Sequence, residues 1–140
     1  MTPEQIASVR DSFGKVAPIA DQAAALFYGR LFEIAPETRT LFKSDIGEQG
    51  RKLMATLAVV VRGLDDLPAL MPAVTRLAER HAGYGVGAAH YLPVGAALLW
   101  TLEQGLGEGF TPEVKDAWTT AYGTLSGAMI AAAETAKPAA

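Results

Sequence analysis

Two histidines, His81 and His90, are the side chains of this chain best suited to bind a metal ion. The helix predicted before the first of them carries apolar residues at helical spacing, Leu70, Val74 and Leu77. His81 follows Leu77 by four residues, which places its imidazole on the same apolar face. A neutral imidazole in an apolar setting can ligate a metal because water does not compete for its lone pair. The same pattern also fits a histidine that only packs in the core, so both interpretations stay open at this point.

The other patterns that could carry chemistry are weaker. Gly83, Gly85 and Gly87 superficially resemble a phosphate-binding loop, but no predicted strand precedes them and the lysine and hydroxyl residue of a P-loop are missing, so a flexible corner is favoured. No Gly-x-Ser-x-Gly motif marks a hydrolase nucleophile. The two histidines also lack the i, i+4 spacing of a helical zinc pair. Because the chain has no cysteine, thiolate zinc sites, iron–sulfur clusters and thiol nucleophiles are excluded.

Composition narrows the class of protein. A chain of 140 residues, half of them hydrophobic, suits a single domain with a sizeable core. Its net charge of -3 gives no electrostatic footprint for nucleic acid. The start lacks the pattern of a signal peptide, and the longest apolar run, Leu53 to Val61, is less than half the ~20 residues that cross a bilayer. We therefore expect a soluble, cytoplasmic protein that neither binds nucleic acid nor inserts into a membrane.

Helical periodicity runs through the chain and no stretch alternates with a period of two, so an all-α fold is predicted. The expected helices span about residues 2–16, 21–35, 49–64, 67–81, 91–106 and 112–130, with a short helical piece at 36–42 and a polar corner at 43–48. Thr2-Pro3-Glu4-Gln5 and Thr111-Pro112-Glu113 are typical helix starts. Residues 131–140 are expected to be a frayed tail on one domain of residues 1–140. A helical bundle or a globin-like sandwich would both fit.

A haem requires fewer protein ligands than a bare metal ion does. The porphyrin supplies four nitrogen ligands, so the chain need offer only one histidine and a large apolar slot. His81 would be the axial ligand. Bulky residues on faces that could close around a flat ring, here called the apolar set, are Phe42, Leu53, Leu57, Leu77, Val86, Val94 and Tyr122. Each of them alone is better explained by ordinary core packing, and only their combination favours haem.

Several longer motifs, spread over nearly the whole chain, are together highly specific. They are Phe27-Tyr28-x-x-Leu31-Phe32, Pro36-Glu-x-Arg39-x-Leu41-Phe42, Leu67-Pro-Ala-Leu-x-Pro-Ala-Val74, Arg80-His81, Ala89-His-Tyr91 and Ala117-Trp118-x-x-Ala-Tyr122-Gly123. With them the chain resembles the globins, and more closely the single-domain bacterial haemoglobins related to the globin part of flavohaemoglobins. This resemblance implies the globin fold, a three-over-three helical sandwich around one haem b (iron protoporphyrin IX).

On the distal side, the resemblance implies roles for four residues. Tyr28 and Gln49 would form the polar part of the pocket, and Leu53 would lie over the iron. Hydroxyl and amide donors suit this place because dioxygen acquires partial negative charge when a haem binds it. Lys52, one helical turn from Gln49, would suit a haem propionate. A glutamine in place of a distal histidine also leaves the sixth position of reduced iron open.

The resemblance makes His81 the proximal iron ligand, and it also implies that Phe42 packs on the haem. In flavohaemoglobins the proximal histidine, a tyrosine and a glutamate form a hydrogen-bonded set that raises the basicity of the imidazole. Tyr91 matches the tyrosine, but Ala133 stands at the glutamate position. Glu134 is one residue later and is rotated by about a third of a turn on a helix. This departure mildly favours gas binding over fast turnover.

The sequence therefore predicts a cytoplasmic haem globin that reversibly binds dioxygen, carbon monoxide and nitric oxide, for oxygen transport, storage or scavenging. The alternative is an enzyme, a nitric oxide dioxygenase. That activity would need an external reductase, since the chain stops where flavohaemoglobins continue into flavin- and nicotinamide-binding domains. A third interpretation is a helical interaction module without a cofactor. A monomer and a homodimer are both compatible with the sequence.

Overall fold

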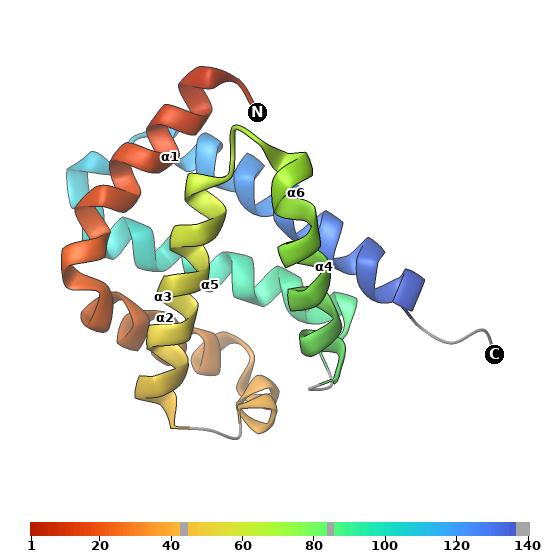
Figure 1. The fold of residues 1–140 in the computed structure, drawn as a ribbon. Coiled ribbons are helices and arrows are strands. Elements are labelled where there is room, and N and C mark those ends of the chain that lie inside the picture. The colour runs from red at the N-terminus through yellow and green to blue at the C-terminus, as the bar shows by residue number, and fades with distance from the viewer. Residues whose placement is uncertain (43–44, 84–85, 137–140) are drawn as a thin grey trace.

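The computed structural model describes residues 1–42, 45–83 and 86–136, and within these ranges the chain forms six α-helices and no strand (Figure 1). The helices are α1 (Pro3–Val16), α2 (Ala20–Ile34), α3 (Ile46–Arg62), α4 (Leu67–Gly83), α5 (Tyr91–Leu106) and α6 (Pro112–Ala136), and short 3-10 segments cover Ala17–Ile19, Pro36–Leu41, Ala88–His90 and Gly107–Gly109. The all-α prediction is confirmed. In the described part, no single helix is long and apolar enough to cross a bilayer, and only the bent pair Leu67–Gly83 with Ala88–Gly109 meets that criterion jointly.

Helix starts coincide with the capping residues that the sequence offers. The N–H of Gln5 donates to the hydroxyl of Thr2 over 3.1 Å, and the N–H of Thr2 donates to the side-chain oxygen of Gln5 over 2.9 Å. These reciprocal bonds complete the predicted capping box of α1. At α6, the N–H of Val114 donates to the hydroxyl of Thr111 over 3.3 Å. The bonds that Gln5 and Val114 donate satisfy amides that have no partner inside their helices.

The start of α3 differs from the sequence-based expectation. The helix begins at Ile46 rather than at Gln49, because Asp45 caps it: the N–H of Glu48 donates to the carboxylate of Asp45 over 3.1 Å. The predicted polar corner at 43–48 is therefore wrong in its second half, and its first residues, 43 and 44, lie outside the described residues. As a consequence Gln49 is one turn into the helix rather than at its mouth.

The end of α6 also differs. The helix continues to Ala136, although a frayed tail was predicted from about residue 131. Alanine has the highest helix propensity, so the run Ala131–Ala133 extends a helix at little cost. Ala132 packs against the core. The predicted boundary was too early, and residues 137–140 lie outside the described part of the chain.

The helices on either side of the 63–66 corner, α3 and α4, pack against different helices. α3 packs on α2, whereas α4 packs on α6, and α2 also packs along α5. Figure 1 shows α3 and α4 leading away from this corner, with α5 crossing behind α3. Arg10 of α1 fixes the corner, because its guanidinium donates to the carbonyls of Val61 (3.2 Å) and Arg62 (2.8 Å) and pairs with Asp65 (2.9 Å). The last carbonyls of α3 thus receive donors from another helix.

Candidate functional site

His81 lies in the last turn of α4 and is half-buried. Its Nδ1 is 2.8 Å from the backbone oxygen of Leu77, one turn earlier. A carbonyl oxygen can only accept a hydrogen bond, so this contact places the proton on Nδ1 and leaves the lone pair on Nε2. That is the tautomer which a metal-ligating histidine needs. Val86 is held next to this site, because its N–H donates to the carbonyl oxygen of His81 over 3.0 Å.

His90 has a different role in the structure. The N–H of Gly87 donates to Nδ1 of His90 over 2.8 Å and closes the short 3-10 turn that leads into α5. The Nδ1 atom of His90 is thus an acceptor, while that of His81 is a donor. Among the described residues, no group of three or more histidine, aspartate or glutamate side chains is arranged to hold a metal ion. Of the two histidines, only His81 combines a ligand tautomer with an apolar helix face.

The apolar set shares one property in the structure: each member is only half-buried. Core residues of similar size are covered almost completely, as Leu31 (0% exposed) and Trp118 (3%) show. Five members lie on α3, α4, α5 and α6, one follows the 3-10 segment Pro36–Leu41, and one follows α4. They are Phe42, Leu53, Leu57, Leu77, Val86, Val94 and Tyr122. Bulky apolar and aromatic side chains of this kind, which the rest of the chain leaves partly uncovered, suit contact with a flat apolar group. The residues present therefore fit a haem.

Tyr28 of α2 is the most buried of the predicted distal residues, with 5% of its surface exposed. Its ring packs edge-on against Phe27 (centroids 5.0 Å apart) and Phe42 (5.2 Å), and it stacks with Phe32 (6.0 Å). Burial raises the pKa of Tyr28 to about 12, so the phenol keeps its proton and remains a hydrogen-bond donor. The structure thus brings the rings of Tyr28 and Phe42 together, while their roles toward a haem stay a prediction.

Close packing of α2 on α3 positions this tyrosine. A Cβ atom on Gly50 would lie 2.7 Å from Cβ of Ala24 and 4.0 Å from Cε2 of Tyr28, so only glycine allows the helices to approach this far. Gln49, the neighbour of Gly50, is half-buried, whereas Lys52 is exposed, as a residue at the rim of a pocket would be. The importance of Gly50 was missed from the sequence, although a glycine inside a helix is a signal of close packing.

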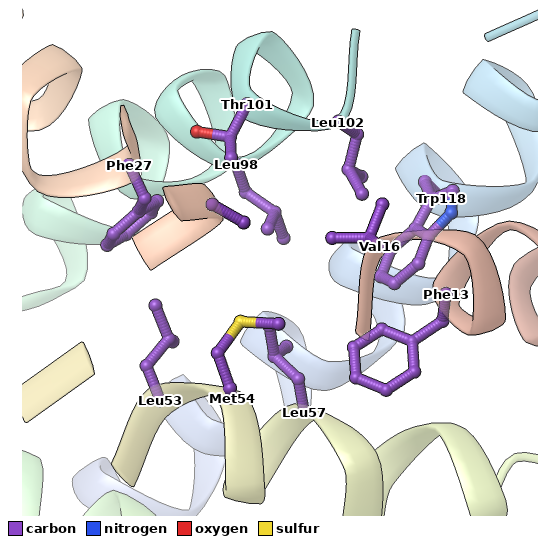
Figure 2. A pocket seen from close by; sticks show the side chains of 11 residues that line it. Phe13, Val16, Phe27, Leu53, Met54, Leu57, Leu98, Thr101, Leu102 and Trp118 are labelled. Carbon is purple, nitrogen blue, oxygen red and sulfur yellow. The ribbon is translucent and has the colours of Figure 1, made fainter. Parts of the chain in front are cut away.

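A small cavity lies between side chains of α1, α2, α3, α5 and α6 (Figure 2). Its volume is about 20 Å³, which is about the space of one water molecule. It is lined by Phe13, Val16, Ala23, Phe27, Leu53, Met54, Leu57, Leu98, Thr101, Leu102 and Trp118. The hydroxyl of Thr101 donates to the carbonyl of Ala97 over 2.8 Å, and Nε1 of Trp118 donates to Ser12 over 2.8 Å. Both polar groups are therefore satisfied elsewhere, and the wall of the cavity is apolar.

The residues predicted to lie around the proximal histidine come from α5 and α6. The hydroxyl of Tyr122 donates to the backbone oxygen of Tyr91 over 2.6 Å. Tyr91 is half-buried, and burial raises its pKa. Ala133 is half-buried on α6, while the side chain of Glu134 lies outside the described part. The hydrogen bond found at Nδ1 of His81 goes to the carbonyl of Leu77, so the role of Tyr91 beside His81 stays a prediction.

Comparison with known proteins now decides the family. A family model described as Globin matches residues 25–129. The chain belongs to the globin family. This globin is 35% identical over 133 residues to a flavohemoprotein of Bordetella parapertussis (93% of this chain, 33% of that protein). It is 36% identical over 107 residues to a flavohemoprotein of Chromobacterium violaceum (74% of this chain, 26% of that protein). The globin thus spans between about a quarter and a third of the length of these relatives.

Solved structures agree with this family. This globin superposes on an engineered carbene transferase, itself a candidate nitric oxide dioxygenase from Rhodothermus marinus, with a TM-score of 0.87, 30% identity and coverage of 96% of this chain and 94% of that one. It superposes on a bacterial globin from Campylobacter jejuni with a TM-score of 0.84, 26% identity and coverage of 96% and 97%. The predicted globin fold and the predicted relation to bacterial haemoglobins are confirmed. The family and its flavohemoprotein members imply a haem cofactor.

The buried phenols make this globin sensitive to alkali. Burial raises the pKa of Tyr28 and Tyr91, and it raises that of Tyr122 together with the nearby phenol of Tyr91. Because these folded-state pKa values exceed the unfolded value of about 10, the stability they support is complete below pH 10 and falls as the pH rises toward about 12. We expect tyrosinate absorbance and loss of helical circular dichroism to rise together in an alkaline titration. Titration of all phenols near pH 10 in a folded protein would contradict this.

Proposed function

We propose that this globin holds one haem b through Nε2 of His81 and reversibly binds dioxygen, carbon monoxide and nitric oxide. The tautomer of His81 carries this proposal, because the bond from Nδ1 to the carbonyl of Leu77 prepares Nε2 as an axial ligand at an apolar helix end. The apolar set would enclose the porphyrin, and the exposed Lys52 would face a propionate. When bound, the haem supplies an iron position at which a diatomic gas can bind.

The chain's own contribution on the distal side is hydrogen bonding. Tyr28 is a protonated phenol in a nearly buried place, and Gln49 offers an amide from the second turn of α3. Both are donors, and donors stabilise a gas that becomes partly negative on binding. Leu53, which lines the apolar cavity, and Phe42, whose ring packs against Tyr28, would help to exclude water from these donors. Water exclusion strengthens each of these hydrogen bonds.

The proximal side favours gas binding over turnover. A backbone carbonyl, that of Leu77, accepts the hydrogen bond of His81. A neutral carbonyl polarises an imidazole less than a carboxylate does, and Ala133 stands where flavohaemoglobins have their glutamate. This weaker polarisation of the proximal ligand suits oxygen transport, storage or scavenging.

Nitric oxide dioxygenation is the second candidate function. It is supported by the flavohemoprotein relatives and by the likeness to a candidate nitric oxide dioxygenase. In this reaction nitric oxide and dioxygen combine to nitrate, and an electron from a separate reductase restores the ferrous state. We propose that the protein works in the cytoplasm as a single domain of residues 1–140, as a monomer or homodimer, with such a reductase as an additional partner.

The first test is the absorption spectrum of the purified protein, which should show a Soret band if haem is bound. Lack of that band after haem is supplied would contradict the proposal and favour the interpretation as a helical interaction module without a cofactor. The second test mixes the oxygenated protein with nitric oxide in the presence of excess dioxygen, a bacterial flavin reductase and reduced nicotinamide, so that dioxygen and electrons are available for every cycle. No sustained nitrate formation is expected for an oxygen-binding protein, while repeated nitrate formation that requires the globin would establish the enzyme.

Replacing Tyr91 by phenylalanine should leave haem bound but shift the iron–imidazole stretching frequency. The phenol is expected to influence His81 through the proximal outer shell, and its loss would change the basicity of the imidazole. Resonance Raman spectroscopy of the ferrous protein measures this frequency. A frequency equal to that of the wild type would mean that Tyr91 does not act on the ligand.

A further inference from the structure

Tyr122 of α6 holds the first residue of α5 in place. Its hydroxyl donates to the backbone oxygen of Tyr91 over 2.6 Å, and these residues are 31 positions apart in the chain. Burial first, and the phenol of Tyr91 second, raise the pKa of Tyr122, so the hydroxyl keeps its proton and remains a donor. The carbonyl of Tyr91 has two lone pairs and can accept this bond as well as the helical one. α5 therefore starts at a point fixed by α6.

Gly95 leaves the space that the ring of Tyr122 occupies. It is buried and lies one helical turn after Tyr91. A Cβ atom on Gly95 would lie 2.6 Å from Cε2 of Tyr122, 3.0 Å from Cδ2 and 3.3 Å from Cζ. Carbon atoms in contact prefer about 3.5–4.0 Å, and an aromatic ring cannot bend aside. Any side chain at position 95 must therefore displace the ring or push α6 away from α5.

Other glycines on these helices are not under this constraint. A Cβ atom on Gly105 of α5 would meet Ile19 and Val16 at 3.7 Å, which is ordinary contact. On α6, Gly123 would meet nothing within 4 Å. Glycine destabilises a helix interior relative to alanine. Of these three positions, only position 95 faces a ring, that of Tyr122, too close for a Cβ atom.

We propose that Gly95 is a positioning residue of the proximal haem side, because its lack of a side chain lets Tyr122 hold Tyr91 and Val94 in place. This inference rests on the proposed function, which puts those two α5 residues against the haem and its ligand His81. Both are half-buried in the first turn of α5. Gly95 itself touches neither haem nor gas and acts only through Tyr122.

The test compares Gly95→Ala with Gly105→Ala in the haem-loaded ferrous protein. Gly95→Ala should shift the iron–imidazole stretching frequency, as Tyr122→Phe should, because each loses the bond to Tyr91. It should also lower the melting temperature by about 3–8 °C, the effect of overpacking a helix contact in a domain of this size. Gly105→Ala, the matched control on the same helix, should leave the frequency unchanged and the melting temperature equal or higher.

A double variant tests whether the ring of Tyr122 causes the lower melting temperature of Gly95→Ala. In a Tyr122→Leu background, Gly95→Ala should no longer lower the melting temperature, because the clashing ring is gone. Persistence of the full loss in that background would overturn the inference. A lowered melting temperature with an unchanged stretching frequency would also overturn it, since Gly95 would then only stabilise the fold. Wild-type protein without a Soret band would overturn the proposed function itself, and this inference with it, whatever the melting temperatures.

Discussion

Replacing His81 by alanine is expected to abolish haem retention, whereas replacing His90 by alanine should leave it nearly intact. The two histidines differ in tautomer: Nδ1 of His81 is bonded to the carbonyl of Leu77, which leaves Nε2 for iron, while Nδ1 of His90 accepts the N–H of Gly87. Losing that turn contact of His90 costs a hydrogen bond of about 0.5–1.5 kcal/mol but no iron ligand. The ratio of Soret to protein absorbance after gel filtration measures haem retention in both variants.

The comparison holds only if both variants fold. Far-ultraviolet circular dichroism should show native helix content in each after haem is supplied. Imidazole added to His81→Ala provides a control, since a free imidazole can restore axial ligation without changing the rest of the chain. Equal haem loss in the two variants, or full retention in His81→Ala, would show that the axial ligand has been placed wrongly.

The order and type of the helices could be predicted from the sequence because apolar spacing and capping residues act locally. Thr2 with Gln5 and Thr111 with Val114 form the caps that the motifs indicate. The start of α3 was predicted too late because the helix was placed where its apolar face begins, at Gln49, although Asp45 followed by Glu48 is itself a helix-start signal. Local signals thus identify helices better than their ends.

Contacts between distant helices could not be predicted from the same signals. The distances from a Cβ atom at Gly50 or Gly95 to the neighbouring side chains depend on how α2 packs on α3 and how α5 packs on α6. No local sequence pattern encodes this packing. The bond from His81 to Leu77 is different, because it joins residues one turn apart and follows from helical geometry once the helix is known. The ligand side of the candidate site was therefore easier to find than the residues that support it.

The distal pair leads to the last prediction, which concerns Tyr28. Its phenol is nearly buried, and its raised pKa of about 12 keeps it a donor at every pH at which the protein would work. A hydrogen bond to a partly charged acceptor contributes roughly 1.5–3 kcal/mol, so Tyr28→Phe should speed dioxygen dissociation by about ten- to a hundredfold. The aromatic contacts of the ring with Phe27 and Phe42 should persist, since phenylalanine keeps its shape.

Carbon monoxide separates hydrogen bonding from pocket shape. It binds with little charge separation and accepts hydrogen bonds weakly, so its dissociation should change far less in Tyr28→Phe than that of dioxygen. Stopped-flow replacement and flash photolysis measure both rates, and Gln49→Leu serves as the matched variant for the second donor. Equal changes for the two gases would mean that Tyr28 acts through pocket shape. No change for either gas would mean that the hydroxyl does not reach the ligand, and that Gln49 is the donor to test next.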